Sequence, residues 1–316
     1  MIVLLDQAGR WMFYGVCADW WSCDRRVIDG SGWTTNNATV AYDAAGRLVS
    51  SFPAAGVSYT YGYGSSLPGC WAGSGRNSDR TTRTGSGGPI VYCYNDRDQL
   101  VSYSVNGATS QQASYDQFGQ TSSLASKSFG WSPRGTHIST TTSATTITFE
   151  RDSTDRIIRR SQTGQSDVWY GYNTGTDQAS YTATATTPYG GTANITDQIS
   201  TLPGGVTLQR HVTDGAVRYS LPNIHGDLLA IVDQNGTKQT NTYHRDTNGN
   251  PIPPSMQPDL LTGNLEQGWL GQYTRQTDTT DPTQPIIEMG TRPYIPTLAR
   301  FLSIDPTDGG NNNDYT

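Results

Sequence analysis

The amino-acid sequence predicts an all-β fold made of antiparallel hairpins, and two observations support this prediction. A short phrase recurs along the chain, in which an apolar residue is usually followed by Asp, two variable residues and Gly. Residues that favour helices are scarce, because the 316 residues include two lysines and three glutamates, whereas Gly, Ser, Thr and Tyr are abundant. Such a composition favours strands and turns over helices.

The recurring phrase is typical of a hairpin turn. It begins at six aspartates, which are Asp6, Asp29, Asp43, Asp116, Asp233 and Asp246. Only about three copies are expected by chance from the Asp and Gly content, and strand-like runs such as 47–51 follow the Gly. Asp can bond its side chain to the backbone two residues on, and Gly supplies positive φ where a hairpin closes. We therefore predict that these aspartates shape turns and do not act as acid–base pairs.

Degenerate copies extend the repeat. They lie at 92–100, 129–135 and 149–157, and the turn-entry positions 94, 115, 131 and 151 are unevenly spaced, which indicates a loose array of short hairpins. Segments 64–89 and 173–205, rich in Gly, Ser, Thr and Pro, are interpreted as loops or polar strands with long connections. The segment 259–271 is the one plausible helix, preceded by a proline-punctuated linker near 250–260.

Composition and charge exclude several classes of function. The net charge is −6 and no basic run occurs, which argues against nucleic-acid binding by this chain. No apolar stretch reaches membrane-spanning length, and the opening residues lack the features of a signal peptide. The sequence contains no phosphate-binding loop and no metal-ligand spacing, so no cofactor and no metal are expected. The four cysteines (Cys17, Cys23, Cys70 and Cys93) allow three disulfide pairings, with free thiols as the alternative.

The most specific motif lies near the C-terminus. Segment 287–306 contains Gly-Thr-Arg from Gly290, then Pro293-Tyr294, and then Ala-Arg-Phe-Leu-Ser-Ile-Asp-Pro, which ends at Pro306. This segment resembles the RHS-repeat-associated core, and the hairpin repeat resembles the tyrosine–aspartate (YD) repeat of the same RHS family. That family includes bacterial polymorphic toxins, toxin-complex components and animal teneurins. Segments 223–228 and 268–273 also resemble phrases that precede the core.

The resemblance implies a fold and a role. It implies that the hairpin array forms a curved sheet or partial β-shell that ends in an RHS-core plug. Residues 1–218 would be the YD-repeat shell segment, degenerate in the first 90 residues, and residues 219–316 the core region, incomplete at its C-terminus. The function implied is a non-enzymatic scaffold that encapsulates a C-terminal toxin segment as its partner. The parent protein would be bacterial and secreted or located at the cell surface.

The resemblance also implies a self-cleavage site in the core. In the family, two aspartates and an arginine cut the chain, and here Asp305 matches the first aspartate and Arg292 the arginine. The second aspartate belongs to a later Asp-Pro-x-Gly phrase that does not occur before Thr316, and Asp308 and Asp314 stand in other contexts. Two positions depart from the pattern, because Pro293 replaces an aromatic residue and Ala299 replaces a glycine. Self-cleavage is therefore not expected of this chain, and a turn role for Asp305 and structural roles for Arg292 and Arg300 are the alternatives.

Two other functions remain open. The chain could be a cell-surface adhesion or carbohydrate-binding repeat protein, in which exposed aromatic side chains stack on sugar rings. The candidate residues are Trp11, Trp20, Trp21, Trp131 and Trp169; packing on a sheet face is the competing explanation for them. The further alternative is an aspartyl autoprotease that releases a C-terminal toxin.

Overall fold

The structure is a computed structural model in which nearly every ordered element is a β-strand. It describes residues 3–5, 11–13, 22–29, 32–54, 56–64, 69–85, 87–185, 193–223, 225–253, 265–281, 283–306 and 313–316, with side chains from residue 39 onward except at 185, 265 and 266. The helical elements within these ranges are three short 3₁₀ turns, η1 (Arg76–Ser78), η2 (Pro203–Gly205) and η3 (Gly271–Tyr273). The predicted all-β fold is confirmed.

The strands follow one another along the whole chain. The first are β1 (Val3–Leu5), β2 (Trp11–Phe13), β3 (Ser22–Asp29), β4 (Gly32–Tyr42), β5 (Leu48–Ala54), β6 (Val57–Gly62), β7 (Thr82–Gly85), β8 (Ile90–Tyr94), β9 (Leu100–Val105) and β10 (Gln111–Tyr115). The next are β11 (Thr121–Leu124), β12 (Lys127–Trp131), β13 (His137–Thr141), β14 (Thr146–Arg151), β15 (Ile157–Gln162), β16 (Asp167–Gly171), β17 (Tyr181–Ala185), β18 (Asn194–Thr201), β19 (Thr207–His211), β20 (Val217–Pro222) and β21 (Leu228–Asp233). The last are β22 (His244–Arg245), β23 (Pro251–Ile252), β24 (Leu265–Glu266), β25 (Thr277–Asp278), β26 (Ile286–Met289), β27 (Arg292–Ile295) and β28 (Arg300–Phe301).

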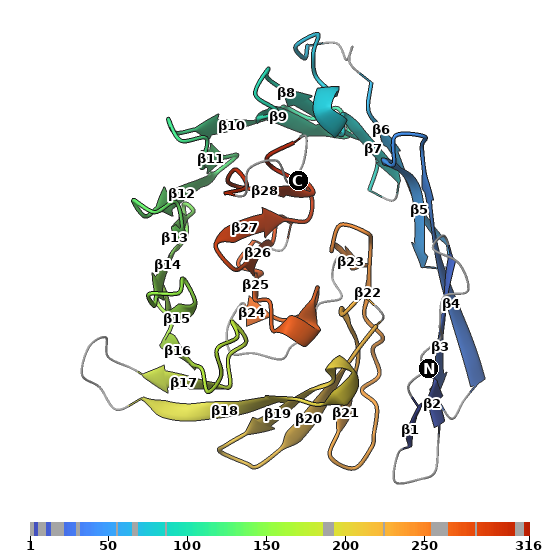
Figure 1. Ribbon diagram of the computed structural model, residues 1–316, viewed down its shortest axis with the longest axis vertical. Helices are drawn as coiled ribbons and strands as arrows, with labels where there is room; N and C mark the ends of the chain where they lie inside the picture. The colour runs from blue at the N-terminus through green and yellow to red at the C-terminus, as the bar shows by residue number, and fades with distance from the viewer. Residues whose placement is uncertain are drawn as a thin grey trace.

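The strands β3 to β21 form one long antiparallel sheet, which we call the wall. Each described register joins strands that are consecutive in the sequence, so the wall is a meander of hairpins. The wall curves around the C-terminal elements, as Figure 1 shows. The curved sheet predicted from the sequence is therefore confirmed.

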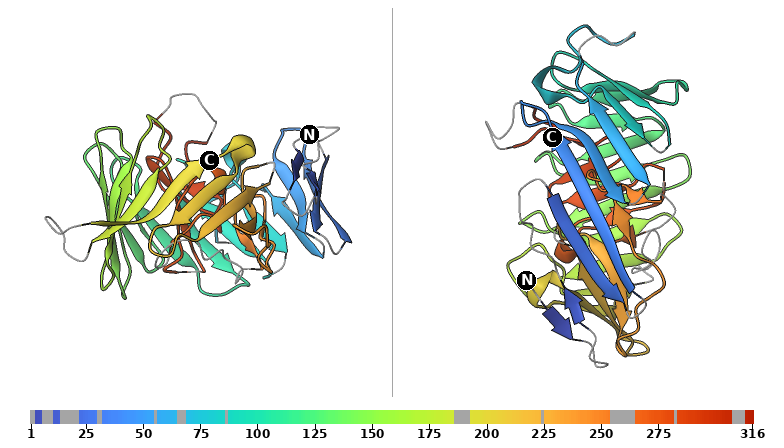
Figure 2. Two further views of the ribbon diagram at one scale, coloured as in Figure 1. Left: turned by 90° about the horizontal axis from the view of Figure 1, so that it is seen from below. Right: turned by 90° about the vertical axis from the view of Figure 1, so that its right-hand side faces the viewer.

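A second sheet lies inside the curve of the wall. Strands β24 to β28 pair in sequence order into a five-stranded antiparallel sheet, which we call the plug. The two side views of Figure 2 show that the plug lies within the depth of the wall. Residues 313–316, the tail, end the chain beside β28 (Figure 1).

The turn role predicted for the repeated aspartates is confirmed where their side chains are described. One oxygen of Asp116 accepts the backbone N–H groups of Phe118 and Gln120, both at 2.9 Å. Gly119 closes this turn at a φ of 78°. The same pair of bonds forms at three other copies, which are Asp43, Asp233 and Asp246. The side chains of Asp6 and Asp29 lie outside the described residues.

The degenerate copies use the same turn with different residues. Asn95 accepts the N–H groups of Arg97 and Gln99, at 3.0 and 3.1 Å. Asp98 takes the glycine's place at a φ of 57°. The same two bonds are made by Asp152, and by the hydroxyl of Ser132. The wall is therefore built from one turn geometry that Asp, Asn and Ser can each supply.

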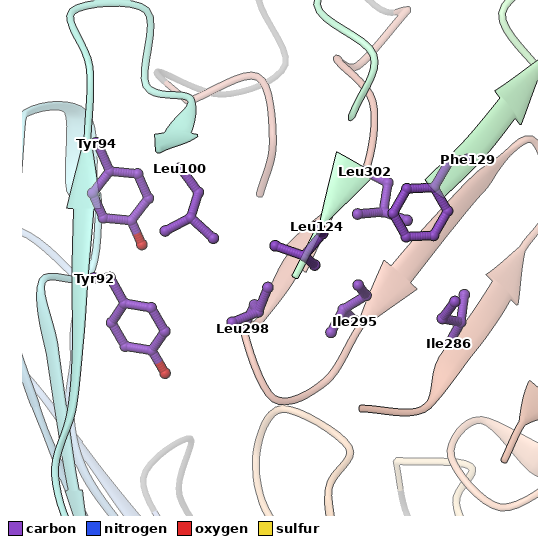
Figure 3. Packing of buried hydrophobic residues seen from close by; sticks show 9 residues of the cluster. All are labelled: Tyr92, Tyr94, Leu100, Leu124, Phe129, Ile286, Ile295, Leu298 and Leu302. Carbon is purple, nitrogen blue, oxygen red and sulfur yellow. The ribbon is translucent and has the colours of Figure 1, made fainter. Parts of the chain in front are cut away.

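An apolar core joins the wall to the plug. Its buried side chains come from wall strands on one side and from the plug on the other (Figure 3), and they are Tyr92, Tyr94, Leu100, Leu124, Phe129, Ile286, Ile295, Leu298 and Leu302. Ile295 is fully buried, and burial of one such side chain contributes roughly 1.5–3 kcal/mol. The hydroxyl of Tyr92 donates to the carbonyl oxygen of Thr297 in the plug at 3.2 Å.

Three sequence-based interpretations are decided by the fold. The helix predicted over 259–271 is wrong in its described part, where 265–266 form β24 and only the turn η3 begins at Gly271. Pairing with β25 outweighs the weak helical pattern, which Gly268 already interrupted. Segments 64–89 and 173–205 include polar strands, β7, β17 and β18, as expected for one of the two alternatives. The boundary at 218/219 stays a prediction, and the wall continues past it to Asp233.

One disulfide is formed within the described residues. Cys70, in the long connection between β6 and β7, is bonded to Cys93 on β8. Cys17 and the side chain of Cys23 lie outside the described part of the chain. Among the described residues no cluster of three or more His, Cys, Asp or Glu side chains is arranged to hold a metal ion. None of the helical turns described is long and apolar enough to cross a membrane.

Candidate functional site

Arg292 and Asp305, the two residues predicted to act in self-cleavage, are in direct contact. A guanidinium nitrogen of Arg292, on β27, donates to a carboxylate oxygen of Asp305 at 2.8 Å. The Arg292 guanidinium also lies over the ring of Phe301, 3.9 Å from its centroid. Burial lowers the pKa of Arg292, and the Asp305 carboxylate opposes that shift. The pair is partly buried, with side chains 16% and 22% exposed. The arginine therefore orients the carboxylate at the edge of the plug.

The tail returns to the segment that carries Asp305. The backbone N–H of Asp305 donates to the carbonyl oxygen of Asp314 at 2.8 Å. The N–H of Phe301 donates to the carbonyl oxygen of Tyr315 at 3.0 Å. Asp314 is exposed, and it contacts Asp305 through its backbone carbonyl oxygen. Asp308, the other aspartate considered for a carboxylate pair, lies outside the described residues. Self-cleavage by Asp305 and Arg292 stays an alternative hypothesis.

Arg300 has the structural role that was considered for it. Its guanidinium donates to a carboxylate oxygen of Asp79, in the wall, at 2.7 Å, and to the carbonyl oxygen of Asp98. The same oxygen of Asp79 accepts the side-chain amide of Asn313, in the tail, at 2.7 Å. Burial raises the pKa of Asp79 to about 6, although Arg300 and Asn313 both favour its charged form. Asp79 thus binds the last strand of the plug and the tail at one point.

A buried charged group joins the middle of the plug to the wall. Glu288, on β26, accepts from His137 at 2.9 Å and from Arg151 at 2.9 Å, through different carboxylate oxygens. The other ring nitrogen of His137 lies 2.9 Å from the carbonyl oxygen of Ser139, which can only accept. Burial alone would raise the pKa of Glu288, but His137 and Arg151 outweigh it and hold this pKa below its ordinary value.

Three more ion pairs connect wall cations to carboxylates of the C-terminal third. They are Lys127–Asp281 at 2.5 Å, Arg160–Asp278 at 2.8 Å and Arg83–Asp246 at 2.9 Å. Lys127 also donates to the side-chain oxygen of Gln284 at 3.0 Å. Together with Glu288, these contacts spread along β7, β12, β13, β14 and β15. Along these strands the wall presents cations to carboxylates of the plug and of the β22–β23 hairpin.

The two phrases that were expected to precede the core pack against each other. The N–H of Leu228 donates to the carbonyl oxygen of Gly268 at 2.8 Å, and the N–H of Gln272 donates to that of Gly226 at 3.0 Å. A carboxylate oxygen of Asp227 lies 2.9 Å from a ring nitrogen of His225. Burial alone would raise the pKa of Asp227, but this contact helps to hold that pKa below its ordinary value. The first turn after β20 thus docks on the entry to the plug.

The tryptophans considered for sugar stacking have structural partners where they are described. The indole N–H of Trp131 donates to the carbonyl oxygen of Thr121 at 2.8 Å, and its ring packs beside the core shared by wall and plug. The ring of Trp169 lies under the Arg159 guanidinium, 5.3 Å away. The side chains of Trp11, Trp20 and Trp21 lie outside the described residues.

A polar cleft of about 250 Å³ opens between the β14–β15 and β16–β17 regions of the wall and the plug. Its three arginines all have acidic partners. Arg151 pairs with Glu288, Arg156 with Asp152, and Arg275 with Asp177. Because these charges neutralise one another in pairs, the cleft is a seam between wall and plug and offers no surplus charge to a ligand.

The sequence indicated Arg292 and Asp305 as members of one site. It did not indicate the residues that hold the plug against the wall. Asp79, His137 and Arg151 occur in ordinary strand and loop contexts of the wall. Glutamate is scarce in this sequence, and Glu288 lies within an apolar strand. A carboxylate in such a strand is costly to bury unless it is paired, so this position could have been identified as one with a buried partner.

Comparisons with known proteins give a likeness of fold. No family model matches the chain, and no curated protein matches its sequence. A solved structure described as TcdB2-TccC3-Cdc42 is similar over 99% of this chain, with a TM-score of 0.54 and 13% identity. A second, described as TcdB2-TccC3-TEV, is similar over 99% of this chain, with a TM-score of 0.55 and 12% identity. This chain spans 18% of the length of each of those chains. The protein therefore shares the fold of part of the TcdB2-TccC3 chains.

Proposed function

We propose that this chain is a wall-and-plug segment of an RHS-type shell, which contains and delivers a C-terminal effector segment. The role is structural, and the parent protein acts outside the cell that makes it. The plug closes the shell and holds the point at which the effector begins.

The observation that carries this proposal is the position of the plug. It lies inside the curve of the wall and is fixed there by a shared apolar core and by buried ion pairs. The tail is bound to Asp79 of the wall, and the C-terminal end lies inside the outline of the wall in Figure 1. A segment that continues from this end would start within the enclosure.

The fold likeness supports the same role. The TcdB2-TccC3 chains match along almost the whole of this chain, which includes both wall and plug. The likeness agrees with the resemblance of the repeats and of 287–306 to RHS shell proteins. Encapsulation of a toxin is the part of the proposal that rests on this agreement.

Containment predicts protection of a passenger at the C-terminal end. An unstructured reporter peptide fused after Thr316 should be cut by a nonspecific protease several-fold more slowly than the same peptide fused before Met1. The reason is that proteolysis requires access to an extended segment, which an enclosing wall restricts. The measurement is the rate of loss of each reporter, with the fusion before Met1 as the matched control.

A variant that unseats the plug sharpens this test. Glu288→Ala should abolish the protection, whereas Glu150→Ala, which removes a partly exposed carboxylate of the wall, should leave it unchanged. Equal cleavage of the two fusions in the wild-type protein would contradict containment by this chain.

Self-cleavage is the second candidate function, and the contact between Arg292 and Asp305 favours it. The arginine orients the carboxylate beside the returning tail, so that a second carboxylate on a continuing chain would approach the same place. One carboxylate could then activate water while the other protonates the amide that breaks.

Self-cleavage predicts two fragments from a longer chain. A protein extended past Thr316 by a segment with an Asp-Pro-x-Gly phrase should separate into two bands in denaturing electrophoresis. Asp305→Asn should yield one band, and Asp43→Asn, a turn aspartate, should still yield two. A single band from the extended wild-type protein would rule out this function and leave the structural proposal intact.

A further inference from the structure

The connection between β6 and β7 reaches from the wall to the end of the chain. Residues 70–80 of this connection, the strap, are anchored at one end by the Cys70–Cys93 disulfide, with Cα atoms 5.0 Å apart. The hydroxyl of Ser74 accepts the N–H of Tyr94 at 2.8 Å and donates to its carbonyl oxygen at 3.1 Å. Both anchors join the strap to β8.

The other end of the strap binds the plug and the tail. Asp79 accepts from Arg300 and from Asn313, both at 2.7 Å. Arg80 donates to the carbonyl oxygen of Leu298 at 3.1 Å, and its guanidinium also bonds the hydroxyl of Tyr92 at 3.3 Å. The strap therefore connects a wall strand to the last strand of the plug and to the tail.

The strap has no apolar anchor of its own. Its buried residues are Gly73, Ser74, Gly75 and Asp79, and Trp71 is 43% exposed. A segment without buried apolar side chains depends on its covalent and polar attachments, and it is among the first parts of a fold to open locally. The disulfide is the strongest of these attachments, and both of its cysteines are only partly buried, so that a small thiol can reach them.

We propose that the Cys70–Cys93 disulfide makes the strap a redox-controlled clamp on the tail. Under oxidising conditions the strap holds Asp79 against Arg300 and Asn313. Under reducing conditions the strap separates from β8 and the tail loses its attachment to Asp79, while it keeps its backbone bonds to Phe301 and Asp305. In the proposed function, on which the biological role of this clamp rests, the shell would loosen its C-terminal attachment on entering a reducing compartment.

The chemical step is ordinary thiol–disulfide exchange with a low-molecular-mass thiol. One thiolate attacks a sulfur atom of the disulfide, the S–S bond breaks, and a mixed disulfide and one cysteine thiolate form. A second thiol displaces the cysteine from the mixed disulfide. The protein disulfide gains two electrons and two protons, and two molecules of the reductant are oxidised to their own disulfide.

Hydrogen exchange of the 316-residue protein, measured by mass spectrometry of peptides, tests the clamp. Dithiothreitol should accelerate exchange in the strap and the tail by roughly tenfold and leave β14 and β15 unchanged. The double variant Cys70→Ser, Cys93→Ser should show the accelerated pattern and no response to dithiothreitol. The double variant Cys17→Ser, Cys23→Ser, the matched control, should respond like the wild type.

A second variant separates the clamp from general loss of stability. Asp79→Ala keeps the disulfide and removes the attachment of the tail to the strap. The tail should therefore exchange faster than in oxidised wild-type protein, and dithiothreitol should then accelerate exchange only in the strap. The clamp is refuted if reduction frees both thiols without changing exchange of the tail, or if it accelerates exchange uniformly along the wall. Because these readouts need no passenger, failure of the clamp is distinguishable from failure of containment.

Discussion

Glu288→Ala is expected to lower the free energy of unfolding by about 3–5 kcal/mol, because it leaves the buried Arg151 guanidinium without its carboxylate partner. Arg151 is 5% exposed and His137 is fully buried, and both depend on this carboxylate. The measurement is denaturant unfolding at neutral pH. Glu150→Ala is the matched control, and it should cost less than about 1 kcal/mol because its carboxylate is 37% exposed.

The cost of Glu288→Ala depends on pH in a definite direction. The pKa of Glu288 is lower in the fold than its ordinary value of 4.5. A carboxyl group with a lowered pKa stabilises the fold above its unfolded pKa, and this contribution is lost as the pH falls through the folded pKa. The difference between wild type and variant should therefore be constant from pH 7 to about 5 and shrink below about 4. A difference that stays constant to pH 3 would contradict an ionised Glu288 paired with Arg151.

Arg300→Met is expected to have an effect of similar size at neutral pH, about 3–5 kcal/mol, because it leaves the buried carboxyl group of Asp79 without its cation. Asp79 is 1% exposed, and its remaining side-chain partner on that oxygen is Asn313. The methionine fills much of the space of the arginine, so the loss measures the missing charge more than a cavity. Arg292→Met is the matched control. It should lower the free energy of unfolding less, since Asp305 is 22% exposed and water can hydrate its carboxylate when the arginine is absent.

Acid should reduce the cost of Arg300→Met between pH 7 and pH 5, a range in which the cost of Glu288→Ala stays constant. Burial raises the pKa of Asp79 to about 6, above its ordinary value of 3.8, so the folded state takes up a proton as the pH falls from 7 to 5. A group with a raised pKa opposes folding more as the pH rises through that pKa. Without Arg300 the shift is larger, and the cost of the substitution should fall by about 1–2 kcal/mol between pH 7 and pH 5. A cost independent of pH in this range would show that Asp79 does not titrate there.

The sequence predicted the local structure of the wall well, because its turn is a local chemical device. Asp116 and Gly119 define a hairpin within five residues, and the same reasoning identified degenerate copies such as the one at Asn95. The core motif predicted the contact between Arg292 and Asp305 only through a family resemblance. Ala299, which stands where that pattern has glycine, still takes a positive φ of 53°.

The contacts that seat the plug could not be predicted in this way. Asp79 and Arg300 are 221 residues apart, and His137 and Glu288 are 151 residues apart. Each of these residues looks like an ordinary polar residue of a strand or loop until the wall has curved. The predicted helix within 259–271 failed for the same reason, because the pairing of β24 with β25 is decided by the plug as a whole.

The sequential pairing of the wall has a consequence for how the protein is made. Each hairpin of the wall needs only its immediate neighbours in the sequence, so a nascent chain can extend the sheet from the ribosome one strand at a time. The plug requires strands β12 to β15 to be in place before its carboxylates find their cations. Until that last step, these cations and the unfilled core are open to other chains, and this is the interval in which a chaperone would be needed.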